Sequence, residues 1–250
     1  MIMSNEVQTL IHQYQQNPCR LHACAIWKTL KNIENYNLII NSNTIKIWNG
    51  TQVHLDFHGD DPKKVSPYDF HQLKLLILHD NQMDDAFLDD FNSHQVYFRL
   101  QYDIGHPREI IHEYHIQEVD TQNELEDVAD FISQCYEDMK PTADYFYRCT
   151  QESVFGGHLW IWVIDPATKK KTGLGIAEYD ANTGEGSLDW IQVLPDEQSK
   201  GIGKVVVTEL TNRLQTQAKF ITVAGKSKYA EKLYRKCGFT GNDVWNVLTK

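Results

Sequence analysis

The stretch that decides the fold is residues 190–204, which read WIQVLPDEQSKGIGK. It begins as an apolar strand that Pro195 ends, and after a short polar loop it enters a predicted helix whose first turn holds Gly201 and Gly203. The first four amides of a helix have no partner within it, and its N-terminus is electropositive. A strand, a glycine-containing loop and a helix in this order therefore favour a phosphate-binding site.

The residues in this loop add to that interpretation. Gly201 and Gly203 would let the backbone approach an anion without an intervening Cβ atom, and Lys200 and Lys204 add positive charge nearby. A Gly-x-Gly pair alone would still favour a helix start that binds no ligand. The interpretation therefore depends on the wider string.

That string resembles motif A of the GNAT acetyltransferase superfamily, which reads [Gln/Arg]-x-x-Gly-x-[Gly/Ala] after an apolar strand ending in Val-x-Pro. Gln198, Gly201 and Gly203 fill the pattern, and Val193 and Pro195 stand at the usual distance before it. Residues 230–239, AEKLYRKCGF, are similar to motif B, a helix that carries a tyrosine and ends in Gly-Phe.

The two motifs follow the family's order, and the resemblance covers roughly residues 110–250. It implies an N-acetyltransferase with acetyl-coenzyme A as cosubstrate, in which a small-molecule or peptide amine attacks directly in a ternary complex. It also implies that the pantetheine arm pairs with the strand like an added strand and that the helix start holds the pyrophosphate. The strand after this helix would splay away to leave a slot for the thioester. The implied contacts are Ile191, Gln192 and Val193 for the arm, then Gln198, Ser199, Lys200, Gly201, Ile202, Gly203 and Lys204 for the phosphates.

Acetyl transfer needs an acid for the leaving thiolate and a base for the ammonium proton. Tyr234 stands where many family members place a tyrosine that reaches the coenzyme A sulfur; the alternative is a ring packed between helix and sheet, as expected for Tyr229 and Phe239. Strand alternation predicts that residues 187, 189, 191 and 193 share one face, with Asp189 about 13 Å from Val193. Family members often carry a carboxylate at this place that acts directly or through water, so the resemblance makes Asp189 a candidate base; the alternative is a solvated carboxylate.

Glu178, on the preceding predicted strand, is the alternative base. One departure from the family is Ser227, seven residues before Tyr234, where many members have an asparagine. Cys237 raises a covalent acyl-enzyme route, but we favour a buried thiol at the end of the motif B helix.

The predicted order of elements in residues 108–250 is β-α-α-β-β-β-α-β-α-β, a GNAT-type mixed central sheet flanked by helices in an α/β (α+β) fold. Residues 1–105 would form a smaller N-terminal α/β domain, which loosely resembles the start of a GNAT fold and is a candidate degenerate copy. Its predicted elements are helices at 7–14, 21–33, 70–79 and 84–91 and strands at 36–40, 44–48, 53–57 and 95–102.

Composition narrows the classes of function. The 250 residues carry a formal net charge of −10, which argues against nucleic acid as a partner, and the apolar runs are too short to predict a membrane span. The five cysteines form no close pair and the eleven histidines no ligand pattern, so we expect reduced thiols and no metal. Without a secretory pattern at residues 1–10, a cytoplasmic location is expected. The alternative function is a non-catalytic acyl-coenzyme A-binding regulatory module.

Overall fold

The computed structural model describes residues 4–22, 25–41, 43–59, 71–105, 112–136 and 139–250. They fall into two compact units. The N-terminal unit comprises Met1–Gln101 together with Ala224–Glu231 and Thr240–Lys250, and the C-terminal unit comprises Tyr102–Val223 and Lys232–Phe239. The domain boundary expected between 105 and 108 remains a prediction.

Five strands in the order β10-β9-β8-β7-β6 form the sheet of the C-terminal unit. Neighbouring strands from β6 to β9 are antiparallel, whereas β9 and β10 are parallel, as a β-α-β crossover requires. The antiparallel run and the crossover predicted from the sequence are therefore confirmed. The strands are β6 (His115–Glu118), β7 (Trp160–Ile164), β8 (Lys171–Asp180), β9 (Glu185–Val193) and β10 (Phe220–Gly225).

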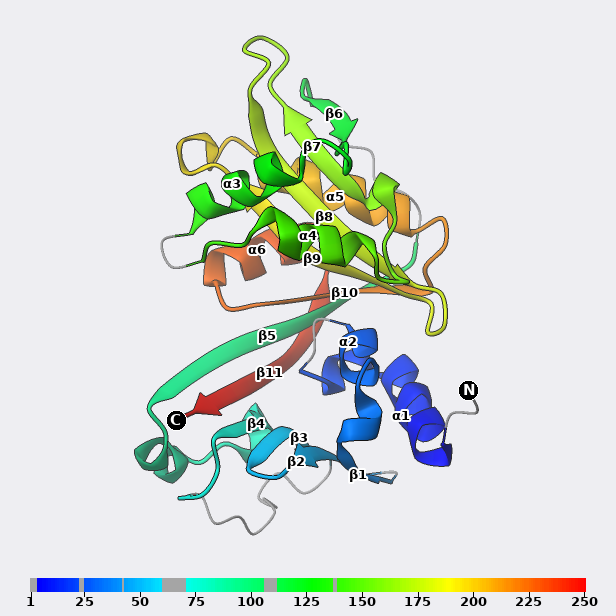
Figure 1. The fold of residues 1–250 in the computed structure, drawn as a ribbon, viewed down its shortest axis with the longest axis vertical. Helices are drawn as coiled ribbons and strands as arrows, with labels where there is room; N and C mark the ends of the chain where they lie inside the picture. The colour runs from blue at the N-terminus through cyan, green and yellow to red at the C-terminus, as the bar shows by residue number, and fades with distance from the viewer. Residues whose placement is uncertain (1–3, 23–24, 42, 60–70, 106–111, 137–138) are drawn as a thin grey trace. The chain divides into compact units, whose positions relative to one another are not determined.

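Helices cover both faces of this sheet (Figure 1). Helix α5 (Ile202–Leu214) lies on one face, where a Cβ atom at Gly175 would come within 2.6 Å of Val206 and 2.8 Å of Leu210. The glycine therefore lets the helix approach the strand closely. Helix α4 (Ala143–Thr150) lies on the opposite face beside α3 (Leu125–Cys135), and its buried Phe146 packs against Trp160 at 5.9 Å.

The motif B segment forms α6 (Lys228–Lys236), as predicted. The last strand of the predicted order is β11 (Thr240–Thr249), which belongs to the N-terminal unit. The first strand of the predicted order is β6.

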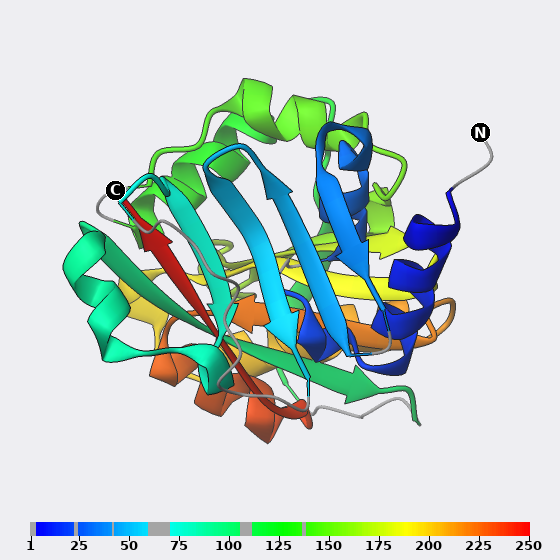
Figure 2. The same ribbon diagram turned by 90° about the horizontal axis from the view of Figure 1, so that it is seen from below.

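In the N-terminal unit, the strand order is β1-β2-β3-β4-β11-β5. The first three strands form an antiparallel meander (Figure 2), and α1 buries Val7, Leu10 and Tyr14. The strands are β1 (Asn37–Ile40), β2 (Thr44–Asn49), β3 (Gln52–His58), β4 (Leu75–His79) and β5 (Ser93–Asp103). The helices are α1 (Asn5–Gln16) and α2 (Ile26–Leu30), with 3-10 turns at Pro18–Arg20, Ile33–Asn35, Asp80–Gln82 and Asp85–Asp90.

Three predicted helices of this unit need correction. The helix predicted at 21–33 is only the short α2 and a 3-10 turn. Residues 75–79 of the helix predicted at 70–79 form strand β4, which pairs with β3 and β11; its continuous apolar run fits a strand buried on both faces. The helix predicted at 84–91 is a 3-10 turn, in which Asp84 accepts a hydrogen bond from the Ala86 amide.

Candidate functional site

Strand β9 carries a β-bulge in the middle of the candidate site. Trp190 pairs with Ile176 and Leu188 pairs with Ala177, so Asp189 is the extra residue. A bulge reverses the alternation of side chains along its strand. Ile191 and Val193 therefore share the α5 face with Leu188, and Ser187 lies on the opposite face with Trp190. The prediction that residues 187, 189, 191 and 193 share one face is wrong.

The parallel pairing of β9 with β10 runs from Glu185 opposite Phe220 to Leu188 opposite Val223. Strand β9 itself continues to Val193, still paired with β8 along its other edge. The bulge thus coincides with the end of the β9–β10 ladder. Within the described pairing, this leaves the β10-side edge of residues 189–193 open to an extended ligand, as the expected splay of the two strands requires.

The loop after β9 presents backbone amides at the start of α5. Ser199 and Gly201 both have positive φ, 65° and 85°, and Gly201 is the N-cap residue of the helix. The first amides bonded to the Gly201 carbonyl are those of Lys204 and Val205. The helix therefore offers no carbonyl acceptor to the backbone N–H groups of Ile202 and Gly203, and these two groups are available to bind an anion.

Charges and side chains near the loop fix its conformation. The Lys200 ammonium lies 2.7 Å from Glu197, and this hydrogen bond raises the pKa of Lys200 and lowers that of Glu197. The Gln198 amide approaches the Val193 carbonyl oxygen at 3.4 Å. Lys200 is therefore paired in this structure, and Lys204 is the exposed cation of the helix start.

The two motif glycines differ in what surrounds them. A Cβ atom at Gly201 would meet nothing within 4 Å, so this position is open. A Cβ atom at Gly203 would lie 2.9 Å from Leu233 and 3.7 Å from Val193. At Gly203 the missing side chain therefore lets α5 pack closely against Leu233. The expected contact of Gly203 with the anion stays a prediction.

The face opposite α5 carries an aromatic cluster around the bulge. Trp190 contacts the rings of Tyr136, Tyr145 and Phe146 at centroid distances of 6.0–6.5 Å. The Gln192 amide donates to the Tyr136 hydroxyl at 3.0 Å. This cluster could not be predicted from the sequence, because the bulge that places Trp190 on this face leaves no sequence signal.

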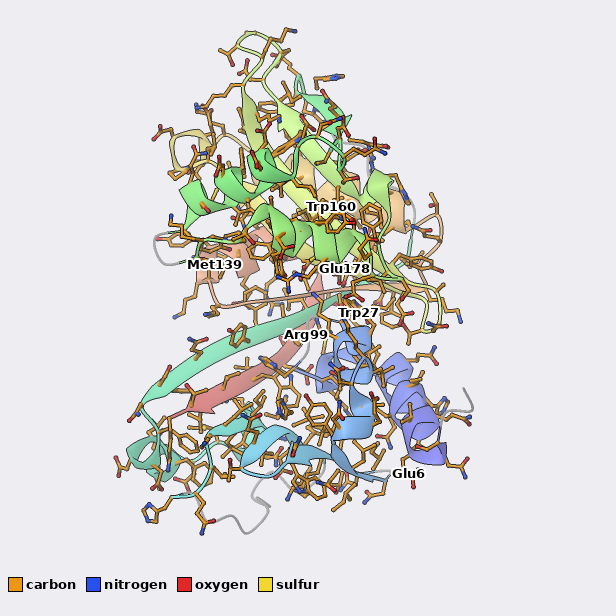
Figure 3. All side chains as sticks on the ribbon, in the orientation of Figure 1. Glu6, Trp27, Arg99, Met139, Trp160 and Glu178 are labelled. Carbon is orange, nitrogen blue, oxygen red and sulfur yellow. The ribbon has the colours of Figure 1, made fainter. Side chains whose placement is uncertain are left out.

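The two candidate bases lie in different surroundings. Glu178, labelled in Figure 3, is a residue of β8. It is buried on the face of Trp190 and accepts a hydrogen bond from Ser187 at 3.3 Å. Asp189 is half-buried at the bulge itself. The carboxylate of Glu178 is therefore fixed by the sheet, and the backbone around Asp189 is displaced from the regular ladder.

Tyr234 is 6% exposed, and its ring contacts Phe239 at 5.7 Å. Phe239 is buried as expected, but Tyr229 is 86% exposed, so the expectation that Tyr229 packs in the core is wrong. Cys237 is a buried thiol at the end of α6, as favoured from the sequence, and forms no disulfide. Ser227 accepts a hydrogen bond from the Tyr229 amide and so caps α6.

The carbonyl of Val193 has a second neighbour, the Cys135 thiol, at 3.7 Å. Burial raises the pKa of this thiol to about 11, so it stays protonated and can only donate. In the described part of the chain, Cys19, Cys135, Cys149 and Cys237 form no disulfide, and Cys24 lies outside the described residues. In the described part of the chain, no group of His, Cys, Asp and Glu side chains could hold a metal ion, and no helix is long and apolar enough to cross a membrane.

Comparison with known proteins agrees with this architecture. Residues 125–239 match the family model described as the acetyltransferase (GNAT) family. No curated protein sequence matches the chain. Residues 125–239 are therefore a GNAT acetyltransferase domain, which supports acyl transfer as its general chemistry.

Solved structures are similar to nearly the whole chain. A GCN5-related N-acetyltransferase from Sphaerobacter thermophilus has a TM-score of 0.60 at 10% identity, over 90% of this chain and 85% of its own. A GNAT-family acetyltransferase from Colwellia psychrerythraea has a TM-score of 0.57 at 13% identity, over 100% and 98%. A GCN5-related N-acetyltransferase from Kribbella flavida has a TM-score of 0.52 at 12% identity, over 92% of this chain and 96% of its own. At these identities the likeness concerns the fold.

Proposed function

We propose that the protein is an N-acetyltransferase that transfers the acetyl group of acetyl-coenzyme A to an amine by direct attack in a ternary complex. The observation that carries the proposal is the open edge of β9 beyond Leu188, which leads directly into the amide-presenting loop of α5. An extended pantetheine arm and a pyrophosphate are connected in the same order and could follow this path.

In the proposed reaction, the amine nitrogen forms a bond to the thioester carbonyl carbon and the carbon–sulfur bond breaks. The acceptor's ammonium proton goes to a base, either Asp189 or Glu178, and the departing thiolate takes a proton from the Tyr234 hydroxyl. Asp189→Asn and Glu178→Gln separate the two bases. The substitution that lowers turnover and raises the pH at which turnover begins identifies the base.

The proposal is tested by free thiol release from acetyl-coenzyme A with a panel of amines: an aminoglycoside, a polyamine, several amino acids and a peptide N-terminus. We expect amine-dependent thiol release with at least one class and mass spectrometry to find the acetylated amine. Thiol release that is independent of amine would instead indicate hydrolysis, and would contradict the proposal.

A second candidate function is a non-catalytic module that binds acyl-coenzyme A. The burial of Tyr234 favours it, because a ring that packs on Phe239 has a structural use without chemistry. Saturable acetyl-coenzyme A binding without turnover across the whole panel would favour this alternative.

A further inference from the structure

The aromatic cluster around Trp190 extends from the core to the surface. Phe146, one of the three rings in contact with Trp190, is fully buried and anchors the cluster in the core. The other two rings, Tyr136 and Tyr145, are 38% and 39% exposed. Large apolar side chains that gather at a surface commonly mark a binding site. The exposed part of the cluster therefore calls for a ligand.

Hydrogen bonds hold the two tyrosines where they meet Trp190. The Gln192 side chain donates to the Tyr136 hydroxyl at 3.0 Å, which ties that ring to β9. The Tyr145 backbone amide donates to the Thr142 hydroxyl at 3.2 Å, which caps α4 and fixes the helix turn that carries the ring. Both tyrosine rings meet Trp190 at an interplanar angle of 79° and do not stack flat on it. The cluster is therefore an ordered wall against which a further ring can pack.

The position of Trp190 relates this wall to the acyl-transfer site. The described β9–β10 ladder ends at Leu188, and the proposed phosphate site follows Val193, so an arm that runs along this edge brings its acyl end toward Trp190. Helix α5 covers one face of the sheet here, because Gly175, the partner of Ile191, lies directly under it. An acceptor must therefore approach from the opposite face, which carries the aromatic wall.

A carboxylate lies on the same face as the wall. Glu178 is two residues along β8 from Ile176, the partner of Trp190, which is a separation of about 7 Å by strand rise. A carboxylate favours a nearby ammonium group, and the aromatic wall favours an apolar ring. A ligand in which a short alkyl chain joins these two parts would contact both.

We propose that this face binds a primary arylalkylamine, which serves as the acceptor: its ring packs against Tyr136, Tyr145 and Trp190 while its nitrogen faces the acyl group. This inference rests on the proposed function and names its substrate class. The new carbon–nitrogen bond gives the N-acetyl arylalkylamine, the broken carbon–sulfur bond gives coenzyme A, and the ammonium proton goes to the base as described above. Polyamines and aminoglycosides carry several polar groups, which are costly to bury against an aromatic wall.

Initial rates of thiol release from acetyl-coenzyme A test the substrate class. They compare phenethylamine with ethylamine, which lacks the ring, and with spermidine. We expect kcat/KM for phenethylamine to exceed both of the other values by about tenfold or more, because the ring is buried against the wall. Equal values for phenethylamine and ethylamine would overturn this substrate class and leave the proposed function standing. So would a higher value for spermidine, an aminoglycoside or a peptide N-terminus.

Variants of α4 test the wall itself. Tyr145→Ala should lower the ratio of kcat/KM for phenethylamine to that for ethylamine by about fivefold or more, whereas Tyr145→Phe, which keeps the ring, should preserve this ratio. Tyr147→Ala is the matched control, because Tyr147 lies on the same helix and is 56% exposed, while the Trp190 ring contacts Tyr145. The control should change the ratio less than twofold. Equal changes in Tyr145→Ala and Tyr147→Ala would overturn the proposal.

Calorimetric titration of the coenzyme A-bound protein with phenethylamine tests the site without turnover. We expect saturable binding that Tyr145→Ala weakens by about fivefold or more and Tyr147→Ala does not. This result would support the arylalkylamine site even if no amine were acetylated, a case in which only the proposed function fails. No saturable binding of phenethylamine would overturn the inference, whatever the acyl-transfer assay shows.

Discussion

At the scale of single residues, Tyr234 has two proposed roles: its ring packs in the core, and its hydroxyl is the candidate general acid. Its ring is buried against Phe239, so Tyr234→Phe removes only the hydroxyl and keeps the packing. If the hydroxyl protonates the leaving thiolate, turnover should fall about 10² or more, because general-acid groups contribute ~10²–10⁴ in rate. The affinity for coenzyme A should stay within a few-fold.

Steady-state kinetics and calorimetry measure these two effects separately. Tyr229→Phe is the matched control on the same helix, because Tyr229 is 86% exposed and should tolerate the change. A Tyr234→Phe variant with unchanged turnover and a lower melting temperature would make Tyr234 a structural residue and leave the acid unassigned.

The phosphate loop is tested best at Gly201, since a side chain at Gly203 would collide with Leu233. Gly201 has φ 85° and open space around it. Asparagine and aspartate tolerate this conformation better than most residues and differ by one charge. Gly201→Asp should therefore bind coenzyme A about tenfold more weakly than Gly201→Asn, because a carboxylate near a pyrophosphate costs about 1–2 kcal/mol. Equal affinities in calorimetry would place the pyrophosphate elsewhere.

At the scale of elements, Lys171 of β8 holds the start of α3 against the sheet. Its ammonium contacts Glu124 at 2.8 Å and Asp127 at 2.7 Å, and it lies 4.4 Å from the centroid of the Trp162 ring. Lys171→Met should lower the free energy of unfolding at pH 7 by about 1 kcal/mol, or the melting temperature by about 2–4 °C. Lys170→Met, which breaks a more exposed pair with Glu197, should have a smaller effect.

This contact also has a predictable pH dependence. Desolvation alone would raise the pKa of Glu124, but hydrogen bonds from Lys171, the Asp120 amide and Trp162 outweigh it and lower the pKa. A lowered pKa in the folded state gives stability that is present above the carboxyl's unfolded pKa and is lost as pH falls through the folded value. The difference in melting temperature between wild type and Lys171→Met should therefore shrink in acid. A difference that grows below pH 4 would contradict this assignment.

At the scale of the whole molecule, we expect one coenzyme A per chain. The amide-presenting loop follows β9 in the C-terminal unit, and the N-terminal half has no Gln-x-x-Gly-x-Gly string, even if it is a degenerate copy. Calorimetric titration should give a stoichiometry near one coenzyme A per chain, and Gly201→Asp should weaken binding at this one site. A stoichiometry near two would mean that the N-terminal unit binds coenzyme A as well.

The sequence by itself determined the elements of the C-terminal half and their family. Residues 190–204 encode their structure locally, because proline, glycine and the apolar pattern fix a strand, a loop and a helix start. Residues 230–239 do the same for α6. The prediction from local sequence was wrong at β4. The mostly apolar residues 73–78 are compatible with a helix or a strand, and pairing with β3 and β11 makes residues 75–79 a strand.

Only the tertiary structure decided which side chains meet at the candidate site. The bulge at Asp189 depends on how β9 pairs with β8, and it moves Ser187 to the face of Trp190 and away from that of Ile191. Likewise, the packing of Leu233 against Gly203 depends on α6, thirty residues along the chain. The order of elements is set by short-range preferences of the backbone, whereas the face that a side chain occupies is set by long-range pairing between strands.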